Sequence, residues 1–157
     1  MNIRHNIQLK PYNSFRTQAF AKLFCEPTTV DELSKIIKRY PEEKKLIIGG
    51  GFNLFFTKDY DGLVIHPQIK GTNILYEDAN LIEIEASASE NWDNFVEHCV
   101  NNNFAGVENL SLIPSSVGAA PIQNIGAYGT EVKDVITLVR TINIHTGEQK
   151  DFTNENC

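Results

Sequence analysis

The chain has 157 residues, of which 41% are hydrophobic, and it carries a formal net charge of −6 with an isoelectric point near 5.2. This length suffices for one domain or two small lobes with a packed core. The acidic balance argues against a nucleic-acid-binding surface, which needs clustered lysine and arginine. No apolar run is long enough to span a membrane, and the polar residues 1–10 lack the apolar core of a signal peptide.

The cysteines and histidines do not form a recognisable framework. Cys25, Cys99 and Cys157 are far apart and odd in number, and the four histidines show no metal-binding spacing. These patterns argue against disulfide bonding and against a structural metal site. We therefore expect reduced, mostly buried thiols and a cytoplasmic protein without a bound metal.

The first predicted element with clear periodicity is a helix over residues 30–40, in which apolar residues recur at helical spacing. Thr29 and Glu32 have the spacing of a capping box at its start. Pro41 ends the helix, because proline cannot continue it. A short apolar run over residues 46–48 then predicts a buried strand.

Further along the chain, residues 62–66 predict another strand, which Pro67 ends. Residues 82–86 alternate between apolar and acidic side chains, which is the period of a half-buried strand. A helix is predicted over residues 92–100, with its tryptophan in the core, and the asparagine run 101–103 ends that helix.

The C-terminal part is rich in β-branched residues and predicts a hairpin. Residues 135–144 form the first arm, residues 145–148 form the turn, and residues 150–152 begin the return. No internal repeat or low-complexity segment is present. We expect two lobes, residues 1–67 and residues 68–157.

Three consecutive glycines at positions 49–51 follow the strand 46–48 and precede Phe52, Asn53 and Leu54. Backbone amides without neighbouring Cβ atoms can curl toward one point and form an anion-binding nest suited to a diphosphate. The stretch fits neither GxGxxG, because position 54 is leucine, nor a P-loop. On these residues alone, a tight turn between strands remains equally open.

A second unusual stretch, residues 109–129, contains no charged residue and many small ones. Small residues allow the backbone to approach a flat aromatic ligand closely. Ser115, Ser116, Gln123 and Asn124 can form hydrogen bonds there without adding charge. Mostly apolar composition with a few polar groups is typical of a ligand-binding wall, and a close-packed core crossover is the alternative.

Together, these stretches resemble the family of bacterial UDP-N-acetylenolpyruvoylglucosamine reductases, also called UDP-N-acetylmuramate dehydrogenases. The glycine turn alone is shared with many flavoproteins, whereas the long uncharged stretch is highly specific. The resemblance extends from about residue 13 to residue 157. The matching motifs are NSF at 13–15, GGGxNL at 49–54, DGLVI at 61–65, GVENL at 106–110, IPSSVG at 113–118 and PIQNIGAYG at 121–129.

The resemblance implies an α+β architecture, the two-lobed FAD-binding fold of the vanillyl-alcohol-oxidase (PCMH) type, with one FAD-binding lobe in each half of the chain. The glycine turn would hold the FAD diphosphate, and Tyr128 would face the substrate. The family usually has serine where this chain has Phe52, so a hydroxyl donor is lost there. The residues assigned to the cofactor on this resemblance are Ile48, Gly49, Gly50, Gly51, Phe52, Asn53, Leu54, Pro114, Ser115, Ser116, Val117, Gly118, Asn124, Ile125 and Gly126.

The resemblance further implies an NADPH-dependent flavin oxidoreductase. NADPH would deliver hydride to FAD, which would reduce UDP-N-acetylglucosamine enolpyruvate to UDP-N-acetylmuramate for peptidoglycan synthesis. The cofactor carries the redox chemistry, and the protein supplies placement and electrostatics. This role belongs to cell wall biogenesis and so to cell shape and division. The expected partner is the UDP-sugar substrate, with no nucleic acid, membrane or protein partner.

The resemblance places the family's catalytic arginine, serine and glutamate, and a third, substrate-binding lobe, beyond Cys157. We therefore assign no catalytic residue in this chain and expect residues 1–157 alone to be inactive. Removing the electrostatic stabiliser (the arginine) and the general acid (the serine) costs on the order of 10² to 10⁴ in rate apiece. Two other functions remain open: another flavin oxidoreductase on the same scaffold, and a nucleotide-binding fragment without catalysis.

Overall fold

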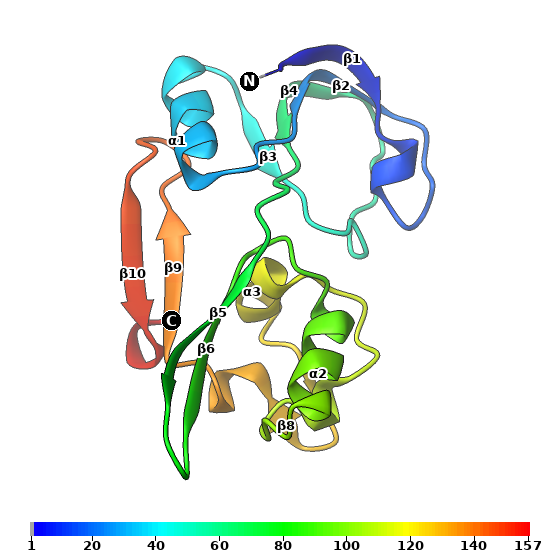
Figure 1. The fold of residues 1–157 in the computed structure, drawn as a ribbon. Helices are drawn as coiled ribbons and strands as arrows, with labels where there is room; N and C mark the ends of the chain where they lie inside the picture. The colour runs from blue at the N-terminus through cyan, green and yellow to red at the C-terminus, as the bar shows by residue number, and fades with distance from the viewer. Residues whose placement is uncertain (1) are drawn as a thin grey trace. The chain divides into compact units, whose positions relative to one another are not determined.

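The computed structural model describes residues 2–157, which divide into two compact units (Figure 1). Unit 1 contains the chain up to Gln68 together with Arg140–Lys150, and unit 2 contains Ile69–Val139 and Asp151–Cys157. The lobe expected over residues 68–157 therefore differs from unit 2, because the segment Arg140–Lys150 groups with unit 1. A hydrogen bond of 2.5 Å from Ser34 Oγ to the Gly147 carbonyl oxygen ties this segment to the rest of unit 1.

Unit 1 is built on a four-stranded sheet with the order β1-β2-β4-β3. The strands are β1 (Arg4–Gln8), β2 (Phe20–Cys25), β3 (Lys45–Ile47) and β4 (Tyr60–Ile65). β1 is antiparallel to β2, whereas β2, β4 and β3 run parallel. The strands predicted over 46–48 and 62–66 are confirmed as β3 and β4. Because parallel strands end at one edge of a sheet, the segments that follow β2, β3 and β4 gather at that edge.

The sequence pattern does not predict β1 or β2, because one strand is too polar and the other is too uniformly buried to show alternation. β1 is largely polar and partly exposed, so it has no apolar period. In β2, four of six residues are buried, and three of them are consecutive, so apolar and polar side chains do not alternate. The unit 1 core consists of Leu9, Ala19, Ala21, Phe24, Ile48 and Val64.

Helix α1 (Val30–Arg39) confirms the predicted helix, but its capping differs in detail. Thr29 Oγ1 accepts a hydrogen bond from the Glu32 amide at 3.1 Å, as an N-cap residue does. The Glu32 carboxylate does not return a bond to Thr29; it accepts instead from the amide and hydroxyl of Thr28, at 2.8 and 3.0 Å. These bonds from Thr28 hold the pKa of Glu32 below its ordinary value.

Unit 2 contains helix α2 (Trp92–Asn101), which confirms the second predicted helix. Trp92 is buried, and its indole N–H donates to the Leu110 carbonyl oxygen at 2.8 Å, so the tryptophan belongs to the core as expected. The unit also holds the short helix α3 (Ala120–Gln123). The core residues are Trp92, Val96, Leu110, Ala120, Ile125 and Val132.

The remaining strands form two-stranded ribbons: β5 (Thr72–Glu77) with β6 (Ile82–Ala86), β7 (Gly126–Ala127) with β8 (Thr130–Glu131), and β9 (Leu138–Ile142) with β10 (Gln149–Thr153). The predicted strand over 82–86 and the predicted C-terminal hairpin are confirmed. All six residues of β5 are exposed, so its sequence shows no apolar alternation. Short 3₁₀ helices cover Lys10–Tyr12, Glu108–Leu110, Val117–Ala119, Val132–Asp134 and Asn154–Asn156.

Two further expectations concern thiols and membranes. Cys25 and Cys99 are buried, as expected, while Cys157 is exposed. Among the helices of residues 2–157, none combines the length and the hydropathy that a membrane crossing requires.

Candidate nucleotide-binding site

The glycine turn, residues 49–54, lies in unit 1 and follows β3 at the edge where the parallel strands end. Gly51 is buried and has a φ of +68°, a backbone conformation that favours glycine. A Cβ atom on Gly51 would collide with the carbonyl oxygen of Tyr12 and lie 3.0 Å from the Cα of Asn13. The bare α-carbon of Gly51 therefore makes room for the loop at residues 12–14.

The ring of Phe52 covers one side of the same turn. A Cβ atom on Gly50 would collide with this ring, whose Cδ2 would lie 2.7 Å away. The Phe52 side chain remains 39% exposed. At the position where the resembled family usually has serine, this chain thus places an aromatic ring against the glycine backbone.

The amide groups of the turn differ from those in the strands beside it. The Ile48 amide donates to the Ile65 carbonyl oxygen at 2.9 Å and extends the β3–β4 ladder. The next residues, Gly49, Gly50 and Phe52, are exposed, and their amides have no acceptor within residues 2–157. Unpaired backbone donors close together are the chemistry of an anion-binding nest.

Two exposed phenylalanines that periodicity does not indicate lie on the loops beside the turn. Phe15 and Phe55 are 59% and 63% exposed, and their rings meet edge to face with centroids 5.5 Å apart. Unit 1 therefore combines the unpaired backbone donors of Gly49, Gly50 and Phe52, within the described chain, with the exposed rings of Phe15 and Phe55. This combination suits a ligand that has both an anionic group and a flat ring.

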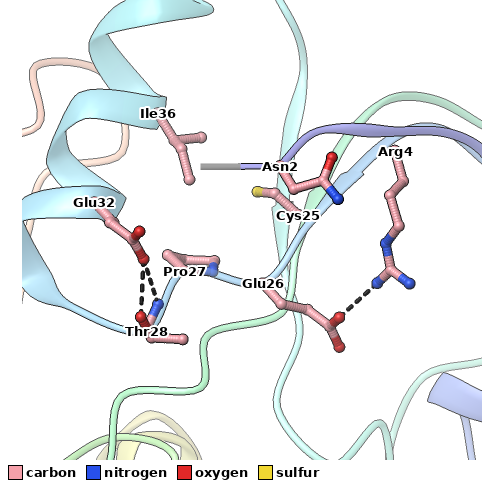
Figure 2. A pocket seen from close by; sticks show the side chains of 8 residues that line it. All are labelled: Asn2, Arg4, Cys25, Glu26, Pro27, Thr28, Glu32 and Ile36. Carbon is pink, nitrogen blue, oxygen red and sulfur yellow. Dashed lines mark hydrogen bonds and ion pairs between the residues drawn. The ribbon is translucent and has the colours of Figure 1, made fainter.

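Unit 1 also contains a cavity of about 340 Å³ (Figure 2). Four of its polar residues pair with one another: Arg4 binds Glu26 at 2.5 Å, and Glu32 accepts from Thr28. Burial raises the pKa of the Cys25 thiol to about 12, so this sulfur remains protonated and is a poor nucleophile. No residue assigned to the cofactor lines this cavity, which is lined by Asn2, Arg4, Cys25, Glu26, Pro27, Thr28, Glu32 and Ile36.

In unit 2, the assigned segment 115–118 packs against residues 88–92. The amides of Val117 and Gly118 donate to the carbonyl oxygens of Glu90 and Ala88, each at 2.9 Å. A Cβ atom on Gly118 would lie 2.6 Å from the Cβ of Ala88, so only glycine fits there. The close backbone approach expected from these small residues is therefore made to the protein itself, and these two amides have protein acceptors.

The assigned segment 124–126 leads into the β7–β8 hairpin. Asn124 is in the left-handed region with φ of 41°, and its side-chain oxygen accepts from the Lys133 amide at 3.3 Å. Ile125 is buried, and it belongs to the same core cluster as Val117. The two assigned segments of unit 2 thus surround one core.

Tyr128 lies at the tip of this hairpin. Tyr128 and Gly129 form the two-residue turn between β7 and β8, and both have positive φ, 53° and 82°, as in a type I′ turn. Tyrosine rarely adopts this conformation, and its side chain is 92% exposed. Leu112 and Ile122, which the sequence does not single out, are also highly exposed, so the uncharged stretch presents several large apolar side chains to solvent.

Comparison with known proteins identifies the class to which this fold and its glycine turn belong. Residues 21–153 match the family described as FAD binding domain, so the chain belongs to this family. The predicted α+β FAD-binding fold is thereby confirmed.

Two relatives with high sequence identity to this chain are both named UDP-N-acetylenolpyruvoylglucosamine reductase. Over all 157 residues, the chain is 50% identical to the UDP-N-acetylenolpyruvoylglucosamine reductase of Flavobacterium johnsoniae, of which it covers 47%. It is 40% identical to the reductase of that name from Pseudomonas fluorescens, covering all of this chain and 47% of the relative. The chain therefore spans about half the length of these relatives.

A solved structure shows the same fold. The crystal structure of UDP-N-acetylenolpyruvylglucosamine reductase from Thermus caldophilus superposes with a TM-score of 0.77 at 22% identity. The superposition covers 99% of this chain and 53% of the Thermus chain.

Proposed function

We propose that this chain is the FAD-binding portion of an NADPH-dependent reductase that converts UDP-N-acetylglucosamine enolpyruvate to UDP-N-acetylmuramate. The observation that carries the proposal is 50% identity across the whole chain to a reductase of that name. The FAD-binding family of residues 21–153 supports the cofactor. The product is a peptidoglycan precursor, and we assign the protein to the cytoplasm on its cysteine pattern.

The donors of the glycine turn fit the diphosphate of FAD. The exposed amides of Gly49, Gly50 and Phe52 supply hydrogen bonds without side-chain charge, which suits an acidic protein that must bind an anion. Gly51 contributes differently, because its α-carbon faces Tyr12 inside the protein. In this proposal, Ile48, Asn53 and Leu54 complete the turn around the diphosphate.

The uncharged segments of unit 2 supply the wall for the flavin and its ribityl chain. Because the amides of Val117 and Gly118 have protein acceptors, we expect the ligand to meet this segment through Pro114, Ser116 and van der Waals contact. Ser115, also assigned to the cofactor, is 6% exposed and its hydroxyl donates to the Ser116 carbonyl oxygen at 3.1 Å, so it supports this wall from inside the protein. The assigned residues that follow α3 are Asn124, Ile125 and Gly126, and they complete this wall.

Tyr128 is assigned to the substrate side. A tyrosine held with positive φ at an exposed hairpin tip is a conformation that folding alone does not favour, which supports a ligand role. When bound, FAD supplies hydride transfer from NADPH to the enolpyruvyl double bond of the UDP-sugar. In this proposal, the chain's own residues bind and orient the cofactor.

The cofactor assignment is tested by titrating the purified 157-residue chain with FAD and following flavin fluorescence. Saturable FAD binding is expected, and FMN, which lacks the diphosphate-linked adenosine, should bind more weakly. A chain that binds no flavin would contradict the assignment. It would favour a different nucleotide, which a parallel ADP titration would detect.

The reductase assignment is tested by a chimera in which this chain replaces the matching segment of the Flavobacterium johnsoniae reductase. We expect NADPH oxidation that depends on the enolpyruvyl UDP-sugar, with UDP-N-acetylmuramate identified by mass spectrometry. A chimera that folds and holds FAD but reduces other substrates instead would favour another oxidoreductase on the same scaffold.

A further inference from the structure

The motif at residues 13–15 lies outside the assigned cofactor site, yet its serine contacts the glycine turn directly. We propose that Ser14 is a positioning residue that fixes the peptide groups of the turn with their N–H bonds directed at the FAD diphosphate. The inference rests on the proposed FAD binding and adds a residue to which neither sequence pattern nor family resemblance assigns a role.

Ser14 makes two hydrogen bonds to consecutive peptide groups of the turn. Its amide donates to the Gly51 carbonyl oxygen at 3.1 Å, and its hydroxyl donates to the Phe52 carbonyl oxygen at 2.9 Å. The partners are 38 residues apart in the chain for the hydroxyl bond. One residue therefore holds two successive carbonyl groups on the same side of the turn.

Because a peptide group is planar, these two hydrogen bonds also fix the direction of the N–H group in each of the two peptides. A trans peptide is planar, and its C=O and N–H bonds point in opposite directions. No peptide bond among residues 2–157 is cis. Because the Gly51 carbonyl points at Ser14, the N–H of Phe52 points away from Ser14. The Phe52 carbonyl fixes the following peptide in the same manner.

The outward direction agrees with the exposure of the turn. Phe52, whose amide points away from Ser14, is exposed and has no acceptor for that amide within the described chain. Gly49 and Gly50 are likewise exposed, and their amides have no acceptor within the described chain. Ser14 thus occupies the carbonyl side of the turn and leaves the Phe52 amide open to a ligand.

Ser14 is itself held by a rigid neighbour. The buried Asn13 side chain donates to the Leu9 carbonyl oxygen at 2.8 Å and accepts from the Thr17 amide at 3.0 Å. The contact of Tyr12 with the bare α-carbon of Gly51 brings the two backbones together. Anchored in this way, Ser14 presets the turn, so FAD does not have to order it on binding.

The test compares three variants of the 157-residue chain for FAD affinity and for thermal unfolding. Ser14→Ala removes only the hydroxyl bond, and Ser14→Thr restores a hydroxyl at this exposed position. Ser34→Ala is the matched control, because Ser34 Oγ also donates to a distant backbone carbonyl of unit 1, that of Gly147. We expect Ser14→Ala to weaken FAD binding about three- to tenfold, the effect of one hydrogen bond, with Ser14→Thr and Ser34→Ala near wild type.

A second measurement locates the effect. In ¹⁵N-correlated NMR spectra, inorganic pyrophosphate should shift the Phe52 amide of the wild-type chain, and this shift should diminish in Ser14→Ala. Equal FAD affinity of Ser14→Ala and wild type would overturn the role of Ser14 while leaving the proposed function intact. So would an equal loss in Ser34→Ala, because it would mark a general loss of stability. Failure of the wild-type chain to bind FAD would overturn the proposed function, and the inference with it.

Discussion

Replacing Gly51 with alanine should destabilise unit 1 strongly, and a second glycine provides the matched control. Both Gly51 and Gly129 have positive φ, +68° and +82°, so both substitutions place alanine in the left-handed region. A Cβ atom on Gly129 meets nothing within 4 Å, whereas one on Gly51 collides with the backbone of Tyr12. The two variants thus separate backbone strain from steric overlap.

The magnitude follows from the contacts of the turn. Alanine in the left-handed region costs about 1–2 kcal/mol in either variant. In Gly51→Ala the turn must also move away from Tyr12, which breaks both hydrogen bonds from Ser14 and adds about 1 kcal/mol for each. We therefore expect a loss of about 3–4 kcal/mol for Gly51→Ala and about 1–2 kcal/mol for Gly129→Ala. Alanine also lowers the conformational entropy of the unfolded chain, which favours folding. This effect is the same in both variants, so it cancels when their stabilities are compared.

The assay is amide hydrogen exchange by mass spectrometry, because it reports opening free energies for peptides of each unit separately. Peptides of unit 1 should lose protection in Gly51→Ala, and peptides of unit 2 in Gly129→Ala by a smaller amount. Equal losses in the two variants would refute the reasoning, since they would show that the contact with Tyr12 costs nothing to disturb.

Three further predictions concern other parts of the chain. Trp92→Phe leaves the buried carbonyl partner of the indole without a donor and should lower the free energy of unfolding by about 1–3 kcal/mol in urea titrations; an unchanged midpoint would contradict this. The lowered pKa of Glu32 stabilises the fold above the ordinary carboxyl value of 4.5, and this contribution is lost as pH falls through the lowered pKa. Glu32→Gln, which keeps an acceptor for Thr28, should therefore flatten the acid limb of a melting-temperature profile, and a profile parallel to wild type would exclude this role. Because burial raises the pKa of Cys25 to about 12, iodoacetamide should label exposed Cys157 and spare Cys25 in the folded chain, as peptide mass spectrometry would show; rapid labelling of Cys25 would mean that α1 and the sheet open readily.

Local pattern predicts those elements whose side chains divide clearly between core and solvent. α1 and α2 bury regular apolar faces, and proline or asparagine marks their ends. β2 and β5 are missed because one is buried at most positions and the other is exposed at all of them. Periodicity carries no information when both faces of a strand are alike.

The candidate site is predictable as a location but not as a set of contacts. Consecutive glycines indicate a turn with free amides, yet they do not tell which glycine faces a ligand and which faces the protein. Gly51 faces Tyr12, and Gly118 faces Ala88, through contacts that only the folded chain creates. The same holds for Ser14, whose partners at the turn are distant in sequence.

The assignment of Arg140–Lys150 to unit 1 determines how the molecule can be dissected. Cutting the gene after residue 68 would leave helix α1 without the loop whose Gly147 carbonyl accepts from Ser34. A minimal recombinant version of unit 1 would have to join residue 68 to residue 140 through a designed linker. A single cut in the chain therefore removes part of one unit, and a truncated protein made in this way would fold less well than the complete unit does.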